Sequence, residues 1–239
     1  ILSLHEAGIE DVRIFEAAPE IRPVGVGINV LPHAVRELTE LGLGTTLATH
    51  GVTTEALMYA NRFGQEIWRE PRGKFAGYLW PQISIHRGVL QMLLFDAVRE
   101  RFGRDIVQCD HRVARVDTSE AGVTIHLENR AGHSLGTATS DILVGADGIH
   151  SAVRATFYPN EGAPKWGSRR VLWRGVTVGE PYLGGATMVM AGFSGVPDVL
   201  EGENNLLIAL STQRHKKSCS VREPSSGLHS TSSVKQIGR

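Results

Sequence analysis

A carboxylate between two glycines, at the end of an apolar run, is the strongest chemical signal in this sequence. The run reaches Val144, continues as Gly145-Ala146-Asp147-Gly148, and is followed by a predicted short helix over 151–157. Glycines let backbone approach a ligand, a helix start offers free N–H groups to phosphate, and the Asp147 carboxylate can accept from a hydroxyl. This is how α/β proteins hold a nucleotide at the carboxyl end of a sheet. A tight turn in which Asp147 caps the following helix is the simpler alternative.

Two further positions carry side chains that could bind the same ligand. Glu16 ends a short β-branched and aromatic run, where a strand-end carboxylate can accept from both hydroxyls of a ribose. Arg87 begins a predicted helix, an unusual place for a cation because that end of a helix is positive, so we expect an anionic or oxygen-rich partner. Gln91 follows one turn later on the same face. An exposed strand-end acid and an ordinary surface arginine are the plain alternatives.

The histidines and cysteines exclude other chemistries. His86 and His150 adjoin the two motifs, but neither has a Cys or His partner at metal-ligand spacing. No Gly-x-Ser-x-Gly turn or His/Asp relay indicates a hydrolase. We therefore predict no metal site and assign no catalytic acid or base. Cys109 and Cys219 cannot form a disulfide framework, which favours a reducing, cytoplasmic environment.

Periodicity predicts the elements that position these residues. An opening helix ends near Gly8, and a wide apolar stripe predicts a helix over 88–102. Pro32 begins a helix that runs to 42, after a predicted loop over 19–29. Strands are predicted over 11–16, 106–108, 112–116, 123–127 and, as a parallel strand buried on both faces, 140–144. Residues 53–85 are predicted to form an antiparallel excursion, and 171–178, 187–192 and 205–210 strands of a second sheet.

Four blocks occur in an order that resembles one enzyme family. They are Ile14-Phe15-Glu16, the loop Ile21 to Asn29, Ser84-Ile85-His86-Arg87-Gly88, and Gly145-Ala146-Asp147-Gly148 with Ser151 and Arg154. Together they resemble the flavoprotein aromatic hydroxylases, a group that includes p-hydroxybenzoate and salicylate hydroxylases. With Trp173-Arg174-Gly175 further on, the similarity is greatest to the phenazine-carboxylate monooxygenase branch, and it extends over about residues 1–210.

The resemblance implies a monooxygenase that uses FAD, NADH or NADPH, and O2 to hydroxylate a small aromatic or heteroaromatic carboxylic acid. It implies that Glu16 binds the FAD ribose and that Arg87, with Gln91, contacts the ribityl or pyrophosphate part. It places Gly27 in the loop beside the flavin, and Asp147 and Gly148 against FAD. Val113 would contact adenine through its backbone, although a simple core role is the plainer reading.

The implied fold class is α/β, with α+β character in the substrate part. We expect a Rossmann-like FAD/NAD(P)-binding sheet that lacks its first strand, and part of an antiparallel substrate-domain sheet. The predicted domains are a partial FAD-binding domain over 1–156 that contains the excursion 53–85, a partial substrate-domain sheet over 157–210, and a disordered tail over 211–239. The chain contains no Gly-x-Gly-x-x-Gly, because Val30 stands where the third glycine would follow Gly25 and Gly27. We therefore expect a fragment, incomplete at both ends, that binds FAD poorly by itself.

Charge separates the predicted tail from the rest. The whole chain has 25 basic and 25 acidic side chains, yet residues 211–239 hold six of the basic and only one of the acidic ones. The balanced total argues against a nucleic-acid partner, and no apolar run reaches the roughly 18 residues of a membrane span. Two alternatives stay open: an FAD-dependent reductase or dehydrogenase on the same fold, and an inactive truncated protein whose basic tail binds an acidic partner.

Overall fold

The computed structural model describes residues 1–61, 63–162, 176–177, 183–191, 207–212 and 216–218. The chain divides into two compact units, one of residues 1–22 with 96–170 and one of residues 23–95 with 171–239. The predicted strand over 171–178, apart from 176–177, the segment Trp173-Arg174-Gly175 and most of the tail lie outside the described residues.

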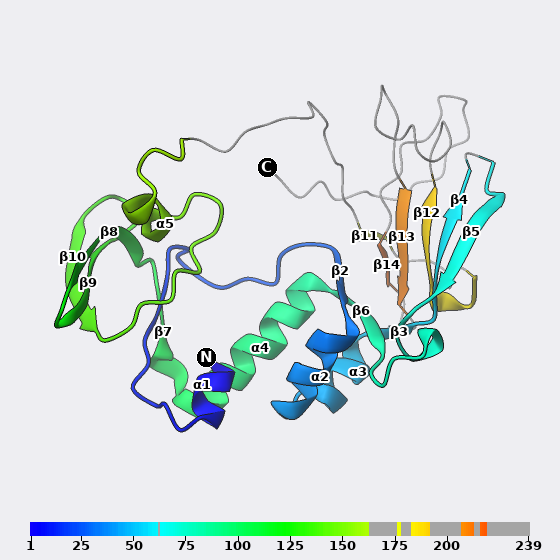
Figure 1. Ribbon diagram of the computed structural model, residues 1–239, viewed down its shortest axis with the longest axis horizontal. Helices are drawn as coiled ribbons and strands as arrows, with labels where there is room; N and C mark the ends of the chain where they lie inside the picture. The colour runs from blue at the N-terminus through cyan, green and yellow to red at the C-terminus, as the bar shows by residue number, and fades with distance from the viewer. Residues whose placement is uncertain (62, 163–175, 178–182, 192–206, 213–215, 219–239) are drawn as a thin grey trace. The chain divides into compact units, whose positions relative to one another are not determined.

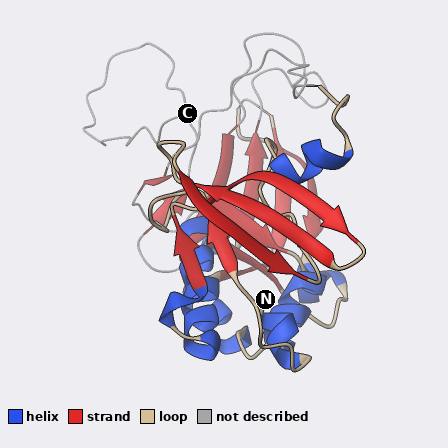
Figure 2. Cartoon of the chain, turned by 90° about the vertical axis from the view of Figure 1, so that its left-hand side faces the viewer, coloured by secondary structure: helices blue, strands red, loops and turns tan. Residues whose placement is uncertain are grey.

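The first unit contains a short parallel strand pair and an antiparallel sheet. β1 (Ile14–Glu16) pairs in parallel with β7 (Val107–Cys109), with Glu16 opposite Cys109. β8 (Arg112–Ser119), β9 (Gly122–Glu128) and β10 (Ser134–Ser140) form the antiparallel sheet, which Figure 2 shows as long twisted strands. The unit also holds α1 (Leu2–Glu6), a 3-10 turn at Arg104–Ile106 and α5 (Ala152–Phe157). Its core consists of Val116, Ile125, Leu127 and Ala138.

The predicted parallel strand over 140–144 is wrong. β10 ends at Ser140, and residues 141–149 form no strand. Ile142 and Val144, expected to be buried on both faces, are 79% and 75% exposed. A strand exists only where a neighbour accepts and donates its backbone hydrogen bonds, and no described strand pairs with this segment. An apolar run is therefore not sufficient evidence for a buried strand.

The second unit begins with a three-stranded antiparallel sheet that positions the start of a long helix. β2 (Gly27–Val30) and β3 (Val52–Thr54) both pair with β6 (Gln82–His86). α2 (Pro32–Glu40), α3 (Gly44–His50) and α4 (Arg87–Phe102) follow these strands, and α4 runs on into the first unit. The core cluster is Val30, Val35, Leu47, Ile83 and Ile85, against which Leu38, Leu90 and Leu93 pack. The predicted loop over 19–29 is corrected here, because residues 27–29 pair with β6 as part of β2.

A six-stranded sheet joins segments that are far apart in the chain (Figure 1). Its order is β11 (Val176–Thr177), β14 (Lys216–Ser218), β13 (Leu207–Thr212), β12 (Thr187–Ala191), β4 (Ala56–Ala60) and β5 (Glu66–Pro71). β12 lies parallel to β4, so the excursion strands belong to the same sheet as the strands after residue 186. Two short 3-10 turns, Gly73–Ala76 and Leu183–Gly185, flank it.

The described residues of the expected disordered tail are in strands. β13 continues through Leu210 to Thr212, and β14 pairs with it in antiparallel fashion. The expectation of disorder is therefore wrong for these residues. Across the described chain, no helix combines the length and the apolar composition needed to cross a bilayer.

Candidate functional site

Glu16 lies at the carboxyl end of β1, where its half-buried side chain holds the following turn. Its Oε1 accepts a hydrogen bond from the backbone N of Ala18 at 2.7 Å. Its backbone carbonyl accepts one from the N of His111 at 2.9 Å. The structure shows no hydrogen bond from a described residue to Oε2, so one carboxylate oxygen is available to a ligand. The expected strand-end position is confirmed, and the ribose contact stays a prediction.

Arg87 is the first residue of α4, and its guanidinium group lies against the loop that precedes β2. The backbone N of Arg87 donates to the carbonyl of Val26 at 2.7 Å. A Cβ placed on Gly25 would lie 2.5 Å from Nε of Arg87. The side chain is exposed and forms no ion pair with the described residues. A free cation at a helix start is an uncompensated charge, which is what an anionic or oxygen-rich ligand would neutralise.

Gly27 and Gln91 lie beside Arg87 in the same unit. Gly27 pairs with His86, the residue before Arg87. Gln91 follows Arg87 by one helical turn, is half-buried, and has no hydrogen bond to a described residue. Three of the predicted cofactor-binding residues therefore gather at the start of α4. The other four, Glu16, Val113, Asp147 and Gly148, belong to the first unit.

Asp147 caps α5. Its carboxylate accepts from the Ser151 hydroxyl and, at 3.1 Å, from the backbone N of Val153. Ser151 is the N-cap residue, and its Oγ accepts from the backbone N of Arg154 at 2.9 Å. Burial alone would raise the pKa of Asp147, but the hydrogen bonds from Ser151 and from the backbone outweigh it, so the pKa is lowered. The expectation that this helix start offers free N–H groups to phosphate is wrong, because side chains of the motif itself occupy them.

The rest of this motif also binds itself together. Arg154 donates through Nη2 to the carbonyl of Ile149 at 2.5 Å and through Nε to Glu161 at 2.7 Å. A Cβ on Gly145 would lie 2.9 Å from Cγ1 of Val153, and Gly148 has a φ of +79°, in the left-handed region that favours glycine. Sequence reasoning missed that Ser151 and Arg154 hold the turn. Their spacing from Asp147 was the available signal.

Val113 has the environment of a core residue. It is half-buried in β8, opposite Leu127 of β9, and packs against the cluster of Val116, Ile125 and Leu127. A side chain in this position stabilises the sheet through apolar contact. The contact of its backbone with adenine stays a prediction.

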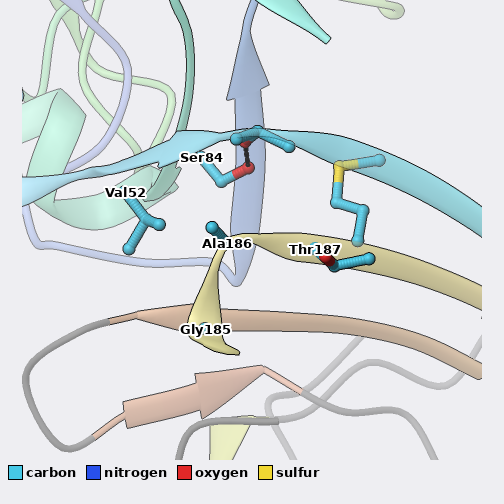
Figure 3. Close-up of a pocket in the computed structure, with 7 residues that line it drawn as sticks. Val52, Ser84, Gly185, Ala186 and Thr187 are labelled. Carbon is cyan, nitrogen blue, oxygen red and sulfur yellow. Dashed lines mark hydrogen bonds between the residues drawn. The ribbon is translucent and has the colours of Figure 1, made fainter. Parts of the chain in front are cut away.

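A chain of buried hydroxyl groups borders a small cavity in the second unit (Figure 3). Oγ of Ser84 donates to Oδ1 of Asn29 at 2.7 Å and lies 2.6 Å from Oγ1 of Thr54. Because the single hydroxyl hydrogen of Ser84 goes to Asn29, Thr54 must donate to Ser84. The cavity has about 10 Å³ of space, enough for about one water molecule and too little for an aromatic substrate. Its lining residues are Val52, Thr54, Ser84, Gly185, Ala186, Thr187 and Met188.

These features define a class of protein. A parallel strand pair with a carboxylate at its end, as in the first unit, is typical of α/β proteins that bind a nucleotide cofactor. An uncompensated cation at a helix start, as in the second unit, complements an anionic ligand. Among the described residues, no three His, Cys, Asp or Glu side chains gather as a metal site would require.

Comparison with known proteins shows what the chain is similar to. No model of a known protein family matches the chain. It is 46% identical over 191 residues to phenazine 1,6-dicarboxylic acid hydroxylase PhzS of Lysobacter antibioticus, covering 80% of this chain and 47% of that protein. It is 33% identical over 176 residues to aurachin C monooxygenase/isomerase of Stigmatella aurantiaca, covering 73% of this chain and 43% of that one. The chain is thus similar in sequence to FAD-dependent aromatic monooxygenases over about half of their length, which confirms the resemblance seen in its motifs.

Solved structures show the same fold. The crystal structure of Klebsiella pneumoniae HpxO, complexed with FAD and uric acid, matches 91% of this chain with a TM-score of 0.63 at 22% sequence identity, over 51% of its own length. The α/β fold class is thereby confirmed. The chain spans about half the length of the relatives that it matches.

Proposed function

We propose that this chain forms the FAD-binding part of a monooxygenase that hydroxylates an aromatic or heteroaromatic carboxylic acid with NADH or NADPH and O2. The observation that carries the proposal is the 46% identity to a phenazine 1,6-dicarboxylic acid hydroxylase over 80% of the chain. The free Oε2 of Glu16 and the uncompensated charge of Arg87 support it from the structure, because both groups complement a nucleotide cofactor.

Different residues of the chain bind different parts of FAD. Oε2 of Glu16 accepts from a ribose hydroxyl, while Oε1 keeps the turn at Ala18 in place. Arg87 and Gln91 contact the oxygen-rich ribityl or pyrophosphate part, and Gly27, the first residue of β2, lies beside the flavin. The Asp147 carboxylate is bound to its own helix, so this motif meets the cofactor through Gly148 and its exposed backbone rather than through free N–H groups. Val113 contributes its backbone beside adenine.

Bound FAD would supply the redox chemistry, taking a hydride from NADH or NADPH and activating O2 for transfer of one oxygen atom to the aromatic ring. The chain's own residues bind the cofactor and orient it. We assign none of them a role as proton donor or acceptor. A small aromatic acid and O2 are the proposed partners, without nucleic acid or metal, and the proposed location is the cytoplasm, where a chain with two cysteines stays reduced.

Titration with FAD followed by turnover assays tests the proposal. Quenching of flavin fluorescence by the 239-residue chain measures cofactor affinity, and we expect weak but saturable binding because the chain has no Gly-x-Gly-x-x-Gly. With NADH or NADPH and phenazine 1,6-dicarboxylic acid, a monooxygenase consumes O2 and yields a hydroxylated product.

Two outcomes contradict the proposal. Anaerobic oxidation of NADH or NADPH with an added electron acceptor, without hydroxylated product in air, would identify a reductase or dehydrogenase. Absence of FAD binding at any concentration would identify an inactive protein. Arg87→Ala serves as the control, because it should weaken FAD binding while leaving the fold intact.

A further inference from the structure

We propose that Gly25 is a positioning residue for Arg87: the missing side chain at position 25 leaves the space in which the guanidinium group lies. A Cβ added to Gly25 would lie 2.5 Å from Nε, 2.9 Å from Nη2 and 3.0 Å from Cζ of Arg87. Real Cβ atoms essentially never approach a neighbour closer than 3.0 Å. Because three atoms of the planar group are affected at once, any side chain at position 25 displaces the whole guanidinium group.

The surrounding backbone cannot move aside in its place. The backbone N of Arg87 is bound to the carbonyl of Val26 at 2.7 Å, and Gly27 is paired with His86 in the sheet. On the other side, a Cβ on Gly88 would lie 2.7 Å from the carbonyl carbon of Pro23. The loop is therefore bonded to the start of α4 at Val26, paired with β6 at Gly27, and closely packed against Gly88 at Pro23. Strain at Gly25 is relieved most easily by rotation of the Arg87 side chain, which is exposed.

The consequence for the cofactor rests on the proposed function. The guanidinium group lies against the loop at Gly25 without an ion pair to a described residue, so the loop favours this position while the charge remains available. A preformed cation costs less conformational entropy on binding than a mobile one. Gly25 thus acts on FAD only through Arg87.

A double-mutant cycle with FAD as the probe tests this. Gly25→Ala, Arg87→Ala and the double variant are compared with the unchanged chain by fluorescence titration. Gly25 has a φ of +117°, so alanine also strains the backbone there. Gly103→Ala is the matched control, since Gly103 has a φ of +95° but no heavy atom within 4 Å of an added Cβ.

We expect Gly25→Ala and Arg87→Ala each to raise the Kd for FAD by about tenfold or more, as the loss of a hydrogen bond to a charged group does. The double variant should be no weaker than Arg87→Ala, and the control should change the Kd by less than about twofold. In the Arg87→Lys background Gly25→Ala should cost less than about threefold, because lysine has no planar group to displace. Multiplicative effects in the double variant would overturn the proposal.

Urea unfolding of the protein without FAD distinguishes failure of this proposal from failure of the proposed function. If Gly25→Ala displaces Arg87, its effect on the urea midpoint is smaller in the Arg87→Ala background than in the unchanged chain. An equal effect in both backgrounds overturns the positioning role. If the unchanged chain shows no FAD binding up to about 1 mM FAD, a Kd that corresponds to a binding free energy of roughly 4 kcal/mol, the proposed function fails. The unfolding cycle alone then decides whether Gly25 positions Arg87.

Discussion

Replacing Ser151 by alanine tests the account of the Asp147 motif. Ser151 is 9% exposed, and its side chain makes two hydrogen bonds, donating to the Asp147 carboxylate and accepting from the backbone N of Arg154 at 2.9 Å. Alanine removes both. The backbone N of Arg154 then loses its cap, and the carboxylate keeps only its bonds to backbone.

The expected loss follows from these two contacts. Removal of a serine N-cap costs about 0.5–2 kcal/mol, and a hydrogen bond to an exposed carboxylate adds about 0.5–1.5 kcal/mol. Ser151→Ala should therefore destabilise α5 by about 1–3.5 kcal/mol. The Asp147 part of this loss depends on pH, because Ser151 contributes to holding the pKa of Asp147 below its ordinary value of 3.8.

The direction of the pH effect is fixed by that lowered pKa. A carboxyl whose pKa is lower in the folded state stabilises the fold above its unfolded pKa and loses this contribution as the pH falls through the folded pKa. The difference between the unchanged chain and Ser151→Ala is thus largest near neutral pH and shrinks as the pH falls below 3.8 and through the lowered folded pKa, towards the N-cap contribution alone.

Hydrogen exchange of peptides that cover residues 148–158 measures the loss where it occurs. A destabilisation of about 1.4 kcal/mol corresponds to about tenfold faster exchange of the α5 amides. Ser140→Ala is the matched control, since the Ser140 hydroxyl is exposed and donates only to the carbonyl of Ile142, at 2.9 Å. Equal losses at neutral and acidic pH would refute the coupling of Ser151 to Asp147, and unchanged exchange would refute the cap.

Three further predictions concern other contacts of the site. Glu16→Gln should raise the Kd for FAD by about tenfold with little loss of stability, because the amide oxygen can still accept from Ala18; fluorescence titration and thermal unfolding separate the two effects. Gly88→Ala should destabilise the second unit by about 1–3 kcal/mol in urea unfolding, since its Cβ would meet backbone at Pro23, whereas Gly77→Ala, in open space at a φ of +86°, should cost less. Ser84→Ala should cost about 1–3 kcal/mol by leaving the buried Thr54 hydroxyl without its acceptor, and Thr54→Val combined with it should restore part of that stability.

Local patterns predicted the elements whose stability is local. The helix expected over 88–102 is α4 at Arg87–Phe102, and the helix expected from Pro32 is α2. The pattern does not predict α3, because Gly44 and its threonines are weak helix formers. This helix depends on burial of Leu47, which is 1% exposed in the core. Such a tertiary contact has no counterpart in the periodicity of the segment.

Strand pairing is the part of the fold that the pattern could not supply. Pro23, Gly25 and Gly27 predict a loop over 19–29, yet residues 27–30 pair with β6, more than 50 residues later in the chain. β12 lies parallel to β4 across a separation of about 130 residues. The run before Gly145 had the composition of a central strand but has no described partner. In each case the deciding hydrogen bonds come from a distant segment.

The residue types predicted where the site residues lie in the fold, but they did not predict which contacts these residues make. Glu16 and Arg87 are where the motifs placed them, at a strand end and at a helix start. Asp147 is also in place, but its carboxylate accepts from the Ser151 hydroxyl and from the backbone N of Val153. Asp147, Ser151 and Arg154 therefore form a self-contained turn.

The two glycine-containing motifs thus act in different ways. Around Asp147, the glycines and polar side chains fix a turn whose hydrogen bonds are largely used within it, so what it can present to a ligand is mainly backbone. Around Arg87, the glycines bring a loop against a helix start and leave the cation without an ion pair among the described residues. A substitution in the Asp147 motif should therefore change the free energy of unfolding more than the affinity for FAD. A substitution at Gly25 or Arg87 should change the affinity for FAD more than the free energy of unfolding. The ratio of these two effects, measured for Ser151→Ala and for Arg87→Ala in the same chain, distinguishes a motif that shapes the fold from one that holds the cofactor.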